Sequence, residues 1–205
     1  MVDANLRLTG REQPVETDAA FEPSTRRAAR RAPTSPQPGV PVPDMVDRLP
    51  RRAAARPATV WWLGVHGGAG ESTLAALASG SRPADHAWPI PTANVTTHHV
   101  VLVARTNYAG LIAAQRAATE WAANTLPQSI SLAGLVLIAD APGRRPKPLR
   151  DLEQVIAGGV PHVWHLPYVS AWRFGPASST DPLPKQFHQL FTDLSLTTSS
   201  THVQN

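Results

Sequence analysis

Residues 59–77 read TVWWLGVHGGAGESTLAAL and join three local patterns. The first seven residues form an apolar run that has the length of a buried strand and is too short for a helix. Glycine then fills three of the positions 67–70, where a tight turn needs backbone freedom. Residues 71–78 are good helix formers that end before Gly80. The stretch predicts a buried strand, a glycine-rich loop and a helix in direct succession.

The remainder of the chain repeats this alternation of strands and helices. Continuous apolar runs predict further strands at residues 99–105, 132–139 and 162–166. Helical spacing of apolar residues predicts helices at residues 108–124, 148–157 and 183–194. Strands that are apolar on both faces belong to sheets covered on both sides. We therefore expect an α/β fold with a mainly parallel sheet of four to five strands and helices on both faces.

Composition divides the chain of 205 residues near residue 57. The first 57 residues hold nine of the 21 prolines, ten of the 19 Lys and Arg residues and seven of the 15 Asp and Glu residues. They contain few bulky apolar residues, so they cannot bury enough surface to offset the entropy of ordering. We expect a disordered Arg/Pro-rich tail at 1–57, a compact α/β domain at 58–195 and a flexible C-terminus at 196–205.

The basic character of the chain lies mostly in this tail, so a basic nucleic-acid-binding surface on the folded domain is not expected. Arginine clusters at 26–31 and 48–56 could contact nucleic acid, a membrane surface or an acidic partner. A solubilising linker is the simpler interpretation, because acidic residues are interleaved.

Several classes of protein are disfavoured by what the sequence lacks. There is no cysteine, which excludes disulfides and thiolate metal sites and fits a reducing compartment. No apolar run approaches the roughly 18 residues of a membrane-spanning helix, and the N-terminus has no secretory signal. The histidines at 98–99 and at 162 and 165 are not spaced as metal pairs on a strand. We expect a cytoplasmic protein.

The loop at residues 66–73 occupies the position of a phosphate-binding loop, between a buried strand and a helix. In such loops, glycine lets backbone N–H groups point inward, and the helix N-terminus adds its positive end. The spacing resembles the deviant Walker A loop of the ParA/MinD family of P-loop ATPases, in which a signature lysine precedes Gly-Gly-x-Gly-Lys-Thr/Ser. The resemblance covers about residues 58–175 and implies a P-loop-like fold.

On this resemblance Gly67, Gly68 and Gly70 keep their places, and Ser72 is the hydroxyl that faces Mg²⁺. The implied cofactor is ATP with Mg²⁺. Similar HGGAGEST loops also occur in an uncharacterised actinobacterial family, often near conjugative-transfer genes, which implies a role in a DNA-transfer or secretion assembly. The candidate phosphate-binding residues are His66, Gly67, Gly68, Gly70, Glu71, Ser72, Thr73, Arg144 and Arg145.

Two residues of the loop depart from the ATPase pattern. His66 stands in the place of the signature lysine and Glu71 in the place of the phosphate-binding lysine. A unit-charge contact at 4 Å is worth about 4 kcal/mol at an effective dielectric constant near 20, so an anion there opposes triphosphate binding. The interval 81–98 also leaves no room for the switch segments and two further strands of that family. We therefore expect no ordinary ATPase chemistry.

Other cations could compensate for the missing lysine, at the edge of the sheet where the glycine loop lies. The carboxyl ends of parallel strands share one edge, which would gather the glycine loop, Asn107, the turn at 140–147 and the pair 172–173. Asp140 ends an apolar run as a Walker B aspartate does and is a weak candidate for Mg²⁺, together with Ser72. Arg144 and Arg145 could replace the lost lysine or pair with Glu71, although a solvated basic turn explains them equally well.

Three functions remain open. The first is a degenerate, non-hydrolysing P-loop-like protein that acts as an adaptor for an unknown protein partner. The second is a genuine nucleotide-binding protein or slow ATPase that uses non-standard cations. The third is a DNA- or membrane-associated accessory protein whose tail does the binding. An esterase with an HGGG-type loop is disfavoured, because no G-x-S-x-G nucleophile elbow is present.

Overall fold

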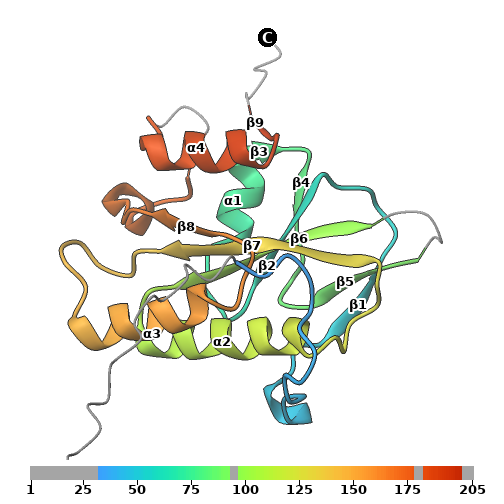
Figure 1. Ribbon diagram of the computed structural model, residues 1–205. Helices are drawn as coiled ribbons and strands as arrows, with labels where there is room; N and C mark the ends of the chain where they lie inside the picture. The colour runs from blue at the N-terminus through green and yellow to red at the C-terminus, as the bar shows by residue number, and fades with distance from the viewer. Residues whose placement is uncertain (1–31, 93–96, 178–181, 200–205) are drawn as a thin grey trace, which may run out of the picture. The chain divides into compact units, whose positions relative to one another are not determined.

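The computed structural model describes residues 32–92, 97–177 and 182–199, which belong to one compact unit beginning at Arg31. Its centre is a five-stranded parallel sheet with the strand order β4-β2-β6-β7-β8 (Figure 1). The strands are β2 (Val60–Gly64), β4 (Ser81–Pro83), β6 (His98–Arg105), β7 (Ile130–Ile138) and β8 (Val163–Leu166). The predicted fold class and the four predicted strands are confirmed.

Helices cover both faces of the sheet, as expected (Figure 1). They are α1 (Glu71–Leu77), α2 (Tyr108–Ala122), α3 (Lys147–Ala157) and α4 (Lys185–Asp193). Helices α2 and α3 pack into the core on one face, while α1 and α4 pack into the core on the other. Each helix lies within a few residues of its prediction. Helix α4 begins at Lys185 because Pro184 precedes it as the N-cap residue.

Strand β2 shows how one apolar run serves both cores. Successive strand side chains point to opposite faces. Trp61 and Leu63 therefore lie in the core beneath α2 and α3, while Val60 and Trp62 lie in the core beneath α1 and α4. Burying each such side chain contributes roughly 1.5–3 kcal/mol, which explains why this strand carries no polar residue.

The end of the predicted tail is ordered. Residues 51–54 form strand β1 (Arg51–Ala54), which pairs in parallel with β5 (Trp88–Pro91). The buried carboxylate of Glu120 anchors this pair, because it accepts hydrogen bonds from the Leu49 backbone N–H and the Trp88 indole N–H. The boundary expected at residue 57 is therefore corrected to a position before β1. Residues 1–31 lie outside the described part.

Two further expectations are corrected by short strands. The interval 81–98 holds both β4 and β5, so it does accommodate two strands, each of only three or four residues. The expected flexible C-terminus contains β9 (Thr197–Thr198), which pairs antiparallel with β3 (Ala78–Ser79). Leu196 is buried beside α1 and α4 and holds this segment against the domain. No helix in the described ranges is long and apolar enough to cross a membrane.

Candidate functional site

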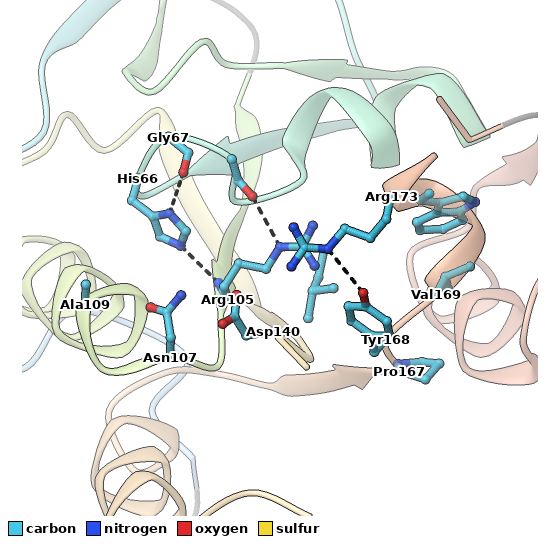
Figure 2. Close-up of a pocket in the computed structure, with 13 residues that line it drawn as sticks. His66, Gly67, Arg105, Asn107, Ala109, Asp140, Pro167, Tyr168, Val169 and Arg173 are labelled. Atoms are coloured by element: carbon cyan, nitrogen blue, oxygen red, sulfur yellow. Dashed lines mark hydrogen bonds between the residues drawn. The ribbon is translucent and has the colours of Figure 1, made fainter. Parts of the chain in front are cut away.

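A cavity of about 400 Å³ opens at the carboxyl ends of β2, β6, β7 and β8 (Figure 2). The glycine loop, Asn107, Asp140 and the pair Trp172–Arg173 border it, as expected, whereas the remainder of the expected turn at 140–147 does not. The lining residues are His66, Gly67, Gly68, Arg105, Asn107, Ala109, Ile138, Asp140, Pro167, Tyr168, Val169, Trp172 and Arg173.

The glycine loop needs glycine at two of its positions for conformational reasons. Gly68 has φ +74° and Gly70 has φ +111°, a region that side-chain-bearing residues rarely adopt. Gly70 serves as the N-cap of α1, and a Cβ on it would lie 2.7 Å from the Ile138 side chain. The loop is therefore a compact turn packed against the end of β7.

His66 faces the end of β6 (Figure 2). Its Nε2 accepts a hydrogen bond from the Arg105 backbone N–H at 3.0 Å, so this nitrogen carries no proton. Its Nδ1 lies 2.9 Å from the Gly67 carbonyl oxygen and must be the protonated nitrogen that donates there. The contacts thus define a neutral imidazole that ties the glycine loop to β6, and this residue does not supply the positive charge of a signature lysine.

Arg105 ends β6 and crosses the cavity. Its Nε donates to the Gly68 carbonyl at 3.2 Å and its Nη1 donates to the Ala139 carbonyl at 3.3 Å, so the guanidinium bridges the glycine loop and the end of β7. Burial lowers the pKa of Arg105; the Asp140 carboxylate opposes this effect, and the charge of Arg173 adds to it. A guanidinium nevertheless stays charged in a protein.

Arg173 approaches from the opposite wall, on the 3-10 turn Ser170–Arg173 that follows β8 (Figure 2). Its Nε donates to the Tyr168 hydroxyl oxygen at 3.1 Å, and its guanidinium carbon lies 5.9 Å from the centre of that ring. The hydrogen bond to Tyr168 raises the pKa of Arg173. Two guanidinium groups therefore meet the same cavity from β6 and from the segment after β8.

Asn107 and Asp140 complete the polar lining. The Asn107 side chain accepts a hydrogen bond from the Gly110 backbone N–H at 2.8 Å and caps α2. The backbone N–H of Asp140 donates to the Thr106 hydroxyl, which fixes the second residue after β7 at the cavity wall. With neutral His66, the lining side chains carry two positive charges and one negative charge, so the cavity has a net charge of +1.

Glu71 does not face this cavity. It is 5% exposed, and its Oε2 accepts a hydrogen bond from the Gly64 backbone N–H at 2.7 Å. Its Oε1 lies 3.4 Å from Nε2 of His86, whose Nδ1 is 2.7 Å from the Gly64 carbonyl oxygen. The carboxylate is therefore turned beneath the loop, toward β2 and His86. The expected repulsion of a phosphate by Glu71 at close contact has no counterpart in this geometry.

The other predicted residues are dispersed. Ser72 is exposed and, like Thr73, does not border the cavity, so it is not brought together with Asp140. Arg145 pairs with Glu153 at 2.5 Å, and the same carboxylate contacts His165. Arg144 is exposed on the turn. Neither arginine pairs with Glu71 among the described contacts, and neither borders the cavity.

Sequence reasoning missed Arg105 and Tyr168 as cavity residues. The signal for Arg105 is present, because it is the charged residue that ends an apolar strand and therefore falls at the carboxyl edge. Tyr168 lies two residues beyond β8, where nothing in the sequence indicates its partner Arg173. No group of three metal-ligating side chains is found within the described ranges.

The fold and the cavity define a parallel α/β protein with a glycine loop after β2 and an arginine-bearing cavity at the carboxyl edge of its sheet. Residues 58–189 match the model of a family of unknown function, DUF6668, and the chain belongs to that family. No curated protein and no solved structure matches the chain.

Proposed function

We propose that this chain is a degenerate P-loop-like protein that binds a small phosphate-bearing ligand without hydrolysing it and acts as an adaptor. The observation that carries the proposal is the approach of Arg105 and Arg173 to one cavity beside the glycine loop. Guanidinium groups bind phosphate through paired N–H donors, and both arginines have N–H groups beyond those already used. These two residues take the place that the sequence suggested for Arg144 and Arg145.

The charge of the cavity favours a ligand with one phosphate. The two guanidinium groups balance the charge of about −2 that a phosphate monoester carries at pH 7, whereas a metal-free triphosphate brings more negative charge than these two groups can balance. Arg105 also donates to the carbonyl of Gly68 within the glycine loop, so a triphosphate that entered this loop would have to displace the guanidinium. A nucleoside monophosphate fits both conditions and the cavity volume of about 400 Å³.

The non-hydrolysing character rests on residues that are turned away. Glu71 replaces the phosphate-binding lysine and is engaged with Gly64, and Ser72 does not border the cavity. If ATP with Mg²⁺ binds, Asp140 is the lining carboxylate able to contact the metal ion. ATP with Mg²⁺, bound through Arg105 and Arg173, is therefore the second candidate ligand.

The adaptor role rests on exposed aromatic residues near the cavity. Tyr108 is 67% exposed and follows Asn107, and Phe174 is 92% exposed and follows Arg173. Aromatic residues exposed in this way are typical of protein-binding surfaces. A partner that contacts them would sense whether the neighbouring cavity is occupied. A cytoplasmic location and a role in a DNA-transfer or secretion assembly stay predictions from composition and resemblance.

Calorimetric titration of the full chain with AMP, ADP and ATP, each with and without Mg²⁺, tests the proposal. We expect AMP to bind, with at least a tenfold loss in Arg173→Ala and no change in Arg144→Ala, the matched control outside the cavity. Absence of binding by every nucleotide, or equal losses in the two variants, would contradict it. An ATP hydrolysis assay separately tests the non-hydrolysing part, which a turnover abolished by Arg105→Ala would overturn.

A further inference from the structure

A second cavity, of about 320 Å³, shares no lining residue with the first. It is bordered by five consecutive residues, 52–56, which comprise most of β1 and its continuation. The opposite side is formed by residues 82–85, at the end of β4 and just after it. Trp61 and Pro89 complete the lining. We call this feature the arginine groove, because three of its residues are Arg52, Arg56 and Arg82.

The arginine groove has an excess of positive charge. Three guanidinium groups border it against one carboxylate, that of Asp85. Arg52 Nη1 lies 3.2 Å from Asp85 Oδ2, and Arg82 Nε donates to the Pro57 carbonyl at 3.0 Å. Arg56 is exposed and forms no ion pair within the part of the chain that the structure describes. The groove therefore has a net charge of +2 and at least one guanidinium free for a ligand.

The backbone along the groove is also able to bind a ligand. Strand β1 pairs only with β5 in the described part of the chain, and β4 is the edge strand of the main sheet. A strand edge with unpaired N–H and C=O groups accepts an extended peptide as an additional strand. Because five consecutive residues of the β1 segment border the groove, an extended peptide could run along them.

Trp61 supplies an independent observation. This residue is 7% exposed, lines the groove and has an indole N–H that is shielded from solvent and finds no acceptor among the described residues. A buried N–H without an acceptor destabilises the fold. Because this N–H is shielded from solvent, a ligand oxygen could accept from it only after a side chain of the groove wall moves.

The geometry points to the arginine groove as a binding site for an extended acidic peptide of a partner protein, in which carboxylates meet Arg52, Arg56 and Arg82 while the peptide backbone adds to β1. The walls of the groove favour a peptide over nucleic acid. They offer small apolar surfaces, from Ala53, Ala54, Ala84 and two prolines. Their one aromatic side chain, Trp61, is buried, so the lining has no exposed aromatic ring on which a base could stack. The contact between Arg52 and Asp85 already shows a guanidinium pairing with a carboxylate at this place.

Fluorescence anisotropy of the full chain with a labelled hexapeptide of alternating glutamate and valine tests the inference. We expect binding that weakens with added salt, that falls at least tenfold in Arg56→Glu and that is unchanged in Arg144→Glu. The second variant makes the same charge reversal on an exposed arginine outside the groove. Arg56 forms no ion pair among the described residues, so its replacement leaves the fold intact; circular dichroism checks this.

Two comparisons complete the test. A lysine–valine hexapeptide should not bind, and excess AMP should not compete with the acidic peptide, because AMP is expected in the first cavity. The inference is overturned if the acidic peptide does not bind, if Arg56→Glu and Arg144→Glu lose affinity equally, or if AMP displaces the peptide. Tighter binding of a single-stranded 12-nucleotide DNA that depends on Arg56 would also overturn it, in favour of nucleic acid.

Discussion

The carboxylate of Glu71 accepts a hydrogen bond from the Gly64 backbone N–H at 2.7 Å, across the base of the glycine loop. Glu71, which the resemblance to P-loop ATPases aligns with their phosphate-binding lysine, is thus part of the packing between α1 and β2. His86 closes the same arrangement, since it contacts both the carboxylate of Glu71 and the carbonyl of Gly64. Glu71, where this chain departs from the ATPase pattern, therefore has a structural role: its carboxylate ties α1 to β2 and His86.

Glu71→Lys should destabilise the fold and should not add affinity for ATP with Mg²⁺. The variant leaves the Gly64 N–H without its acceptor, at a cost of about 1–3 kcal/mol, and places an ammonium group beside the His86 imidazole. Urea unfolding measures the loss. Glu71→Gln is the matched control, because its amide oxygen can still accept from Gly64, and it should lose less. Unchanged stability of Glu71→Lys together with new binding of ATP and Mg²⁺ would show that the carboxylate acts on the ligand.

Gly110→Ala should disturb the contact between the glycine loop and α2. A Cβ at this position would lie 2.3 Å from the Arg105 carbonyl oxygen and 2.9 Å from His66 Nε2. Overpacking of this kind costs about 1–3 kcal/mol, and here it would push His66 away from the Arg105 N–H. Thermal unfolding should show a lower midpoint. Gly67→Ala meets no atom within 4 Å and should keep the wild-type midpoint; equal midpoints for both variants would contradict the argument.

Four of the five strands of the main sheet could be predicted because each is a short, mostly apolar run packed between two layers of helices. Residues 60–64, for example, have no exposed position. Short strands such as β1 and β9 could not be predicted, because their few residues carry no apolar period and depend on distant partners. Arg51–Ala54 form a strand only because residues 88–91 lie beside them.

The place of the site could be predicted, but the side chains that form it could not. The carboxyl-edge rule brings Asn107, Asp140 and Arg173 to one cavity. It says nothing of side-chain direction, so Glu71 was expected to face the ligand although it turns toward Gly64. Arg145 is a candidate for the loop from the sequence alone, whereas the buried carboxylate of Glu153 holds it beside α3.

Asp193 should make stability depend on pH in the acid range. The Trp164 indole N–H donates to its carboxylate at 2.9 Å and Gln189 donates to it at 2.6 Å, and these bonds lower the pKa of Asp193. A carboxyl whose pKa is lower in the folded chain than the unfolded value of about 3.9 stabilises the fold above that value, and the contribution is lost as the pH falls through the folded pKa.

Asp193→Asn should therefore lower the urea midpoint at pH 7, and its deficit relative to the wild type should shrink as the pH falls below about 4. Asp151→Asn removes an exposed pair with Lys147 on the surface of α3 and should change the free energy of unfolding at pH 7 by less than about 0.5 kcal/mol. A deficit of Asp193→Asn that stays constant from pH 7 to pH 2.5 would show that the carboxylate charge is not the stabilising feature.

Asp140→Asn should change which ligand the first cavity prefers. Asp140 contributes the negative charge among the lining side chains, so Asp140→Asn raises the net charge of the cavity from +1 to +2. The asparagine amide keeps nearly the same shape as the carboxylate. Without Mg²⁺, the added attraction grows with the charge of the ligand, so ADP and ATP should gain more affinity than AMP. Calorimetric titration of wild type and variant with all three nucleotides in EDTA measures these gains.

Arg144→Gln, a charge change outside the cavity, should leave the order of affinities unaltered. If Asp140→Asn instead weakens all three nucleotides, the carboxylate contacts the ligand directly, for instance through a ribose hydroxyl, and the charge argument for a single phosphate fails.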